Sequence, residues 1–180
     1  MNFVQPIRDP DKISAIKHFF KSRSERDYMM FLVGINTGLR ISDILQLKVG
    51  DLRGQHIRLR ETKTRKQKMI RITPELGREL KRYLGDKEDH EYIFQSRVGE
   101  NKPIGRSRAY KILREAADAY NLVDIGTHTL RKTFGYHFYL QTKDVAMLQE
   151  LFNHSSPHIT LRYIGINQDS MDKAMSKFKI

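Results

Sequence analysis

The chain has 180 residues, a length typical of one domain and sufficient to bury a substantial core. Lysine and arginine number 33 against 21 aspartate and glutamate residues, which gives a formal net charge of +12 and a pI near 9.9. An excess of this size favours a polyanionic partner, because neutralising phosphates releases condensed counterions. It does not separate DNA from RNA, from an anionic membrane surface, or from a merely basic protein.

The chain has no cysteine, which excludes a disulfide framework and a thiolate metal site. Its first residues lack the apolar core of a signal peptide. The most apolar run, residues 29–35, is far short of the ~20 residues that cross a bilayer. We therefore expect a protein of the cytoplasm with no membrane partner.

Apolar residues at helical spacing dominate the first part of the chain. Asp9 and Pro10 look like a cap followed by proline at the first helical position. Ser24 is expected to cap a second helix that ends at Gly38. Ser42 is expected to start a short third helix.

The spacing then changes to a period of two. Ile57 and Leu59 alternate with polar residues, and so do Ile70 and Ile72. This alternation predicts an antiparallel hairpin with one buried face and a polar, basic tip at residues 62–67.

Helical patterns return after the hairpin. Thr73 is expected to open a helix that runs through Leu84. Further helices are expected around residues 107–120, 128–140, 144–152, 159–163 and 170–177. The expected class is mainly α with a small antiparallel β-sheet (α+β).

Positive charge is densest along the hairpin. Residues 53–72 contain eight lysines and arginines and a single acid, Glu61. Such density favours contact with phosphates, and the alternative is a solvated edge strand that lysines protect from aggregation. The candidate DNA-binding residues are Arg58, Arg60, Arg65, Lys66 and Lys68.

Arg40 lies close behind the glycine that ends an apolar helix, which places it at a junction between helices. A guanidinium offers a planar fork of donors that matches two phosphate oxygens, and it stays charged at any working pH. Asp43 lies three residues later and is expected to orient Arg40 by a hydrogen bond. The alternative is a structural Arg–Asp pair on a helix.

His128 and Arg131 are three residues apart, so they share a helix face near its N-terminus, with Thr127 as the expected cap. The partial positive charge of that end suits an anion. The alternative is an ordinary helix surface. We expect no metal, because the chain has no His-Glu-x-x-His motif and no acidic cluster beside these histidines.

Tyr163 follows His154 by nine residues, after a polar break at residues 153–157. Thr160 and Tyr163 then share one face of the next turn. A lone tyrosine here would be read as core filler. With two arginines and two histidines, however, it completes the groups needed to attack a phosphodiester with a phenol.

These residues, in this order, resemble the catalytic domain of the tyrosine recombinases, the phage integrase family, over residues 12–163. The resemblance implies the tyrosine-recombinase catalytic-domain (DNA breaking-rejoining) fold. It also implies that Lys63, at the hairpin tip, is the general acid. The catalytic set that it implies is Arg40, Lys63, His128, Arg131, His154 and the nucleophile Tyr163.

The chain departs from the family pattern in three places. Lys132 follows Arg131 where the family often has histidine, and Phe152-Asn153 precedes His154 where Leu-Gly is usual. The family's usual N-terminal core-binding domain is expected to be absent. Residues 1–180 are therefore expected to be one catalytic domain, either excised from a longer integrase or standing alone, as in the fimbrial phase-switch invertases.

The implied activity is cleavage and rejoining of double-stranded DNA through a 3′-phosphotyrosine intermediate, with no cofactor, metal or ATP. The implied assembly is a monomer in isolation and a tetramer on DNA. Two alternatives remain: a type IB topoisomerase-like enzyme that relaxes supercoils without strand exchange, and a regulator that binds DNA on the same fold without cleaving it.

The expected tail, residues 164–180, contains an apolar stripe at helical spacing, formed by Met171, Ala174, Met175 and Phe178. The stripe could dock on a neighbouring protomer, as C-terminal segments do in the resembled family. It could instead fold back on its own domain.

Overall fold

The computed structural model describes residues 4–179, so the two ends of the expected domain, residues 1–3 and 180, lie outside the described part. Between those limits the chain forms nine α-helices, one 3-10 turn and one two-stranded antiparallel sheet. The expected class, mainly α with a small antiparallel sheet, is confirmed. Within residues 4–179, no helix combines the length and the apolar character that crossing a membrane would require.

The elements follow the order of the sequence pattern. The helices are α1 (Pro10–Lys21), α2 (Glu25–Thr37), α3 (Ile41–Ile44), α4 (Pro74–Leu84), α5 (Arg106–Ala119), α6 (Thr129–Thr142), α7 (Val145–Phe152), α8 (Pro157–Ile164) and α9 (Ile166–Met175). The 3-10 turn η1 (Val49–Leu52) precedes the strands β1 (His56–Arg60) and β2 (Gln67–Arg71).

Side-chain caps start several helices where the sequence predicts them. Asp9 accepts a hydrogen bond from the backbone N–H of Asp11, and Ser24 accepts one from Asp27. Thr73 likewise caps α4. Each of these bonds satisfies an amide that the first helical turn would otherwise leave without a partner.

Two expected helix starts are wrong. The third helix begins at Ile41 with Arg40 as its cap residue, not at Ser42. The α6 cap residue is His128, not Thr127, because a tight turn closed by bonds between Gly126 and Thr129 comes immediately before the helix. Both starts depend on turns that the hydrophobic spacing does not encode.

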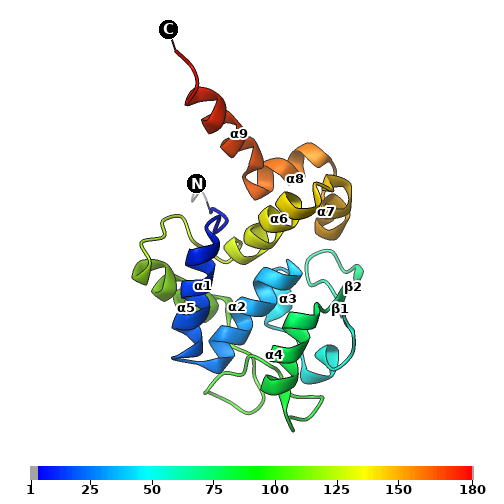
Figure 1. Cartoon of the computed structure of the whole chain (residues 1–180). Helices are drawn as coiled ribbons and strands as arrows, with labels where there is room; N and C mark the ends of the chain where they lie inside the picture. Colours follow the sequence, from blue (N-terminus) through cyan, green and yellow to red (C-terminus); the bar gives the residue numbers. More distant parts are fainter. Residues whose placement is uncertain (1–3, 180) are drawn as a thin grey trace.

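The core is built around α2, which packs against α1, α4 and α6. α2 is buried on almost every side, with Met30 and Val33 fully buried. A second, smaller cluster lies between α6, α7 and α8, around Leu148, Phe152 and Ile164. Figure 1 draws these three helices above α2, α3, α4 and the hairpin.

One glycine sets how closely the two clusters approach. Gly38 ends α2 in the left-handed region, at φ 62°, and a Cβ there would overlap the ring of Phe134 on α6. Glycine adopts this conformation without steric cost. The chain can therefore turn sharply into α3 directly beneath α6.

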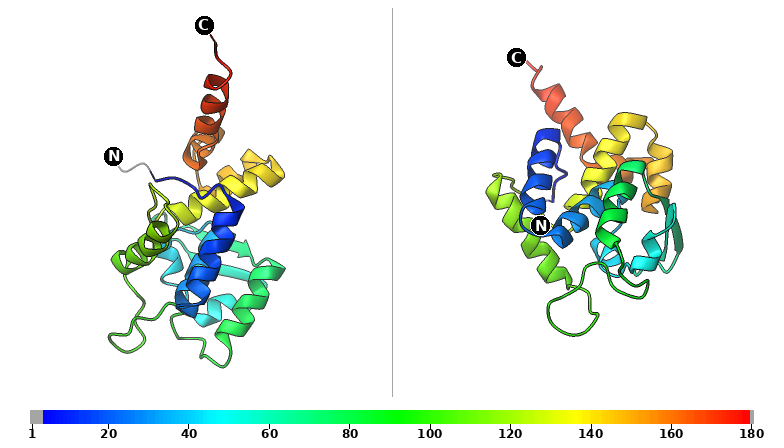
Figure 2. Two further views of the ribbon diagram at one scale, coloured as in Figure 1. Left: turned by 60° about the vertical axis from the view of Figure 1, so that its left-hand side comes forward. Right: turned by 60° about the horizontal axis from the view of Figure 1, so that its bottom comes forward.

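The last helix, α9, projects from the body of the molecule in all three ribbon views (Figures 1 and 2). None of its residues is buried. Its first turn is fixed by an ion pair of 2.8 Å between Arg8 and Asp169, and the Arg8 guanidinium also lies over the ring of Tyr136. The expected stripe of Met171, Met175 and Phe178 is exposed.

Candidate active site

Arg40 is held at the α2–α3 junction by a partner that the sequence analysis did not assign. Its Nη1 donates to Oε1 of Glu61 at 2.9 Å, across 21 positions of sequence. The expected hydrogen bond between Asp43 and Arg40 is wrong. The buried Asp43 accepts instead from the backbone N–H of Thr62 at 2.8 Å, because the hairpin tip folds over α3.

Glu61 is fully buried. Burial acts to raise the pKa of its carboxyl, but hydrogen bonds and charge from Thr64, Lys68 and Arg40 outweigh it and lower that pKa to about 2. The group is therefore an anion at any working pH. Its signal in the sequence was its position as the single acid in a strongly basic hairpin.

Arg131 is 2% exposed, so the second arginine of the site is an internal residue. Its Nη1 donates to the carbonyl of Gly38 at 2.5 Å, and its Nη2 donates to the carbonyl of Phe152 at 3.0 Å. The guanidinium also lies 4.0 Å from the ring centroid of Phe152. The C-terminal ends of α2 and α7 are thus joined through one cation, which complements the partial negative charge of both ends.

Tyr163 lies on α8 against His128. Its phenol oxygen is 3.2 Å from Nδ1 of His128. Burial raises the pKa of the phenol above its usual value, and the charges of Arg131 and Arg40 offset part of that rise. The phenol is therefore protonated at neutral pH and needs a base to become a nucleophile.

His128 can be that base. Burial lowers the pKa of its imidazole, and the neighbouring Arg131 and Lys132 lower it further. A neutral imidazole with a free lone pair on Nδ1 can accept the phenol proton at the observed distance. The site therefore pairs a protonated phenol with an unprotonated base.

His154 follows the left-handed Asn153 that ends α7. Its Nδ1 lies 3.1 Å from the hydroxyl oxygen of the buried Thr160, and its ring lies 5.1 Å from that of Tyr163. Burial, then Arg131 and Arg40, lower the pKa of His154 to about 4. The Thr160 hydroxyl also lies 3.2 Å from the carbonyl of Ser156, to which it can donate. When it donates to Nδ1 of His154 instead, Nε2 carries the proton and can donate to an anion.

Lys63 and Lys68, both on the hairpin, differ sharply in position. Lys63 is exposed and lines a cleft of about 620 Å³ together with Arg40 and His128. Lys68 was expected to contact DNA, and this is wrong. Its ammonium points inward, donates to Glu61 at 3.1 Å and also donates to the carbonyl of Leu151.

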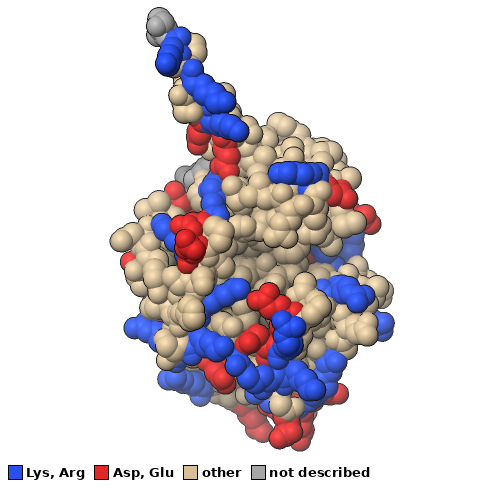
Figure 3. All heavy atoms as spheres, viewed as in Figure 1, with Lys and Arg blue, Asp and Glu red and all other residues tan. Residues whose placement is uncertain are grey.

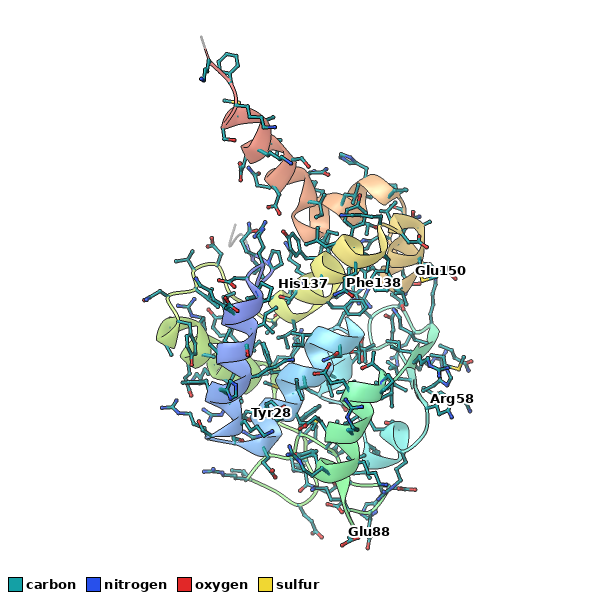
Figure 4. The ribbon with its side chains drawn as sticks, viewed as in Figure 1. Tyr28, Arg58, Glu88, His137, Phe138 and Glu150 are labelled. Carbon is teal, nitrogen blue, oxygen red and sulfur yellow. The ribbon has the colours of Figure 1, made fainter. Side chains whose placement is uncertain are left out.

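The other hairpin cations lie on the surface. Arg58 points away from the body at the outer edge of the hairpin (Figure 4). Arg60 donates to the carbonyl of Arg65 at 2.8 Å, and Lys66 is exposed beside them. On the face shown in Figure 3, lysine and arginine gather over the lower half of the molecule and along α9, while much of the upper half carries few charges.

The structure brings most of the expected catalytic residues together. Arg40, Arg131, His154 and Tyr163 interact electrostatically or through their rings, and His128 contacts Tyr163. Lys63 approaches the same cleft from the hairpin. Arg106, at the start of α5, lines this cleft as well and was not singled out by the sequence analysis, because its position depends on the loop before α5.

The side chains of this cluster are suited to one kind of chemistry. Two guanidiniums and two imidazoles can stabilise a pentacoordinate phosphorus, and a phenol beside a base can attack it. Among residues 4–179, no group of three or more histidine or acidic side chains is arranged to hold a metal ion.

Comparison with known proteins identifies a family and several relatives. The sequence profile described as "Phage integrase family" matches residues 8–169. A Bacillus subtilis (strain 168) protein named "Probable integrase/recombinase YoeC" is 51% identical over 179 residues, which cover 99% of this chain and 98% of that protein. A Pseudothermotoga lettingae protein named "Tyrosine recombinase" is 26% identical, over 98% of this chain and 66% of its own length.

Solved structures share the fold. The crystal structure of XerA recombinase superposes with a TM-score of 0.75 at 20% identity, over 98% of this chain and 65% of that one. A XerH recombinase bound to a palindromic difH substrate gives 0.72 at 17% identity, over 97% of this chain and 53% of that one. The chain thus spans nearly all of YoeC but only part of these longer proteins.

The lowered pKa of His154 predicts how stability depends on pH. Between pH 6.5 and about 4, the unfolded chain binds a proton on this residue that the folded chain refuses. The free energy of unfolding should therefore fall as the pH drops through this range, by at most about 1.4 kcal/mol per pH unit for one full proton. Urea unfolding at several pH values measures the slope.

The variant His154→Asn should show a shallower slope than the wild type over the same range. Comparison of the two proteins at pH 8, where both forms of residue 154 are neutral, gives the cost of the substitution itself. Equal slopes in the two proteins would contradict the assignment of this pH dependence to His154.

Proposed function

The chain belongs to the phage integrase family, and on that premise we propose that it cleaves and rejoins double-stranded DNA through a covalent phosphotyrosine. The single observation that carries this proposal is the contact of 3.2 Å between the Tyr163 phenol oxygen and Nδ1 of His128, with the charges of Arg131 and Arg40 acting on the same phenol.

The attack begins with the approach of a scissile phosphate to the cleft. Arg40 and Arg131 bind its non-bridging oxygens, and His154 donates a further hydrogen bond from Nε2. His128 takes the phenol proton as the Tyr163 oxygen bonds to phosphorus. Negative charge builds on the phosphoryl oxygens in the transition state, where the two guanidiniums stabilise it.

The leaving group departs from the other side of the phosphorus. The bond between phosphorus and the 5′ oxygen breaks, and Lys63 donates a proton to that oxygen. The products are a 3′-phosphotyrosine and a free 5′-hydroxyl. The phosphotyrosine conserves the energy of the broken bond, so that another 5′-hydroxyl can reverse the steps without metal or ATP.

DNA is the proposed partner because the surface around the cleft is basic. Arg106 lines the cleft, and Arg58, Arg65 and Lys66 extend the positive charge along the hairpin. Relatives of the same fold are seen in complex with recombination sites, as the XerH structure on difH illustrates. We propose that the enzyme works in the cytoplasm, where chromosomal or phage DNA is accessible in bacteria.

The proposed activity is recombination, not relaxation of supercoils and not DNA binding without cleavage. The named relatives are integrases and recombinases, and the comparisons give no support to a topoisomerase or to a regulator. Strand exchange needs four active sites on two duplexes, so we propose that monomers assemble into a tetramer on DNA. The exposed apolar residues Met171 and Met175 on α9, with Phe178 just beyond its end, are suited to dock in a groove of a neighbouring protomer.

The first prediction from this proposed function concerns the nucleophile. Tyr163→Phe removes the phenol oxygen and keeps the ring that packs between Phe152 and His154. It should bind DNA as the wild type does and form no covalent adduct with a nicked suicide substrate on a denaturing gel. An adduct formed by the variant at the wild-type rate would refute the role of Tyr163.

The second prediction separates Lys63 from its neighbour Lys66. Lys63→Ala should slow cleavage of ordinary DNA by about 10²–10⁴-fold, because the 5′ oxygen leaves without a proton. A substrate with a 5′-phosphorothiolate needs no such proton and should restore the rate. Lys66→Ala serves as the matched control and should only weaken binding in a salt-dependent way. Rescue of Lys66→Ala instead would move the acid to that residue.

The third prediction concerns assembly. Deletion of residues 168–180 removes the stripe and also the Asp169 partner of Arg8. The truncated protein should no longer form oligomers on DNA in gel-shift or light-scattering measurements, while its melting temperature stays within a few degrees of the wild type. The single variant Asp169→Asn controls for the lost ion pair. Intact assembly with a strongly lowered melting temperature would contradict a docking role.

A further inference from the structure

Glu61 joins three separate segments of the site through one carboxylate. Oε1 accepts from Arg40 at 2.9 Å and from Lys68 at 3.1 Å. Oε2 accepts from Thr64 at 2.5 Å and from Asn153 at 3.0 Å. Each oxygen therefore has two donors, and the carboxylate has no exposed surface. A buried anion with this number of partners has very little freedom to move.

The three segments carry groups of the proposed reaction. Arg40 belongs to the α2–α3 junction, and it lines the cleft. Thr64 lies next to Lys63 in the hairpin turn, and Asn153 lies next to His154 in the turn between α7 and α8. A shift of the carboxylate would move all three segments relative to one another.

Asn153 is the feature that extends this network to the α7–α8 turn. It ends α7 in the left-handed region, at φ 53°, a conformation that glycine and asparagine both adopt. Glycine, usual at this position in the family pattern, would end the helix equally well but has no side chain to reach Glu61. The asparagine adds a bond of 3.0 Å across 92 positions of sequence.

Arg40 depends on this carboxylate for its orientation. Its Nη1 is fixed to Oε1 of Glu61, and its side chain is largely buried. A guanidinium with one edge held by a carboxylate presents its remaining N–H groups in a fixed plane. Phosphate clamping needs such a plane, because a displacement of about 1 Å at a reacting group can cost about 10²-fold in rate.

We propose that Glu61 is a positioning residue that aims the Arg40 guanidinium at the scissile phosphate and, through Thr64 and Asn153, holds the Lys63 turn and the His154 turn in register with it. The inference rests on the proposed cleavage of DNA for its consequence. The immobilisation of Arg40 by Glu61 can be tested whether or not the protein cleaves DNA.

The test must separate positioning from simple stabilisation. Glu61→Leu alone would leave the buried Lys68 ammonium without its anion, which is strongly destabilising. The double variant Glu61→Leu/Lys68→Met removes both charges of this pair, so that Arg40, whose side chain keeps 18% of its surface exposed to water, is the one cation that loses its anion. Lys68→Met alone is the matched control, because it retains the bond between Glu61 and Arg40.

The expected result is a split between stability and rate. Lys68→Met should melt within a few degrees of the wild type, and the double variant should melt lower but stay folded at the assay temperature. At saturating suicide substrate, Lys68→Met should keep its single-turnover cleavage rate within about threefold of the wild type, whereas the double variant should lose about 10²-fold, the cost typical of a misplaced charge-stabilising donor. The dissociation constant for DNA should change little in either protein.

A second measurement reads Arg40 directly. In ¹⁵N-labelled protein, the guanidinium N–H signals that disappear in Arg40→Lys belong to Arg40. They should be sharp and protected from exchange in the wild type and in Lys68→Met, and broadened or lost in the double variant. If the double variant fails to fold, Glu61→Gln/Lys68→Met keeps the shape of the side chain and should show a smaller loss of the same kind.

The outcomes are distinct. A double variant that cleaves as fast as Lys68→Met, with unchanged Arg40 signals, would show that Glu61 only stabilises the fold and would overturn the proposal. Wild-type protein that forms no adduct with any DNA would refute the proposed function. In that case the Arg40 signals still decide whether Glu61 immobilises this side chain.

Discussion

The site depends on the cation of Arg131, which is buried where two helices end. Its guanidinium donates to the carbonyls of Gly38 and Phe152, and so it joins the end of α2 to the end of α7. Two orphan carbonyls gain a charged donor, and the guanidinium gains partners that offset its loss of water. Since α8 with Tyr163 follows α7 directly, this cation helps to place the nucleophile relative to the core, together with the packing of α8 against α6 and α7.

Burial and neighbouring charges also set the protonation states of the side chains around the cleft. Burial and the two arginines keep His128 and His154 from being protonated near neutral pH, while burial keeps the Tyr163 phenol from ionising. Base and nucleophile are therefore poised in the states that proton transfer needs. Glu61 supplies the compensating negative charge from a position that is inaccessible to solvent.

Local sequence patterns predicted the helices and strands, but they could not predict polar contacts between residues far apart in the sequence. Helical spacing and caps such as Ser24 gave α2, and the period-two alternation gave the hairpin, since both depend on near neighbours. The partner of Arg40 could not be assigned, because Glu61 lies 21 positions away and Asp43 was nearer in sequence. Lys68 was misread as a surface cation for the same reason: its burial depends on α7, which lies across the fold.

The central claim is that one phenol becomes bonded to one end of a DNA strand. The most direct measurement is mass spectrometry of the trapped complex after digestion with protease and nuclease. The account predicts a nucleotide attached through its 3′-phosphate to the peptide that contains Tyr163, and a free 5′-hydroxyl on the released strand. A nucleotide on any other residue, or a linkage through a 5′-phosphate, would contradict it.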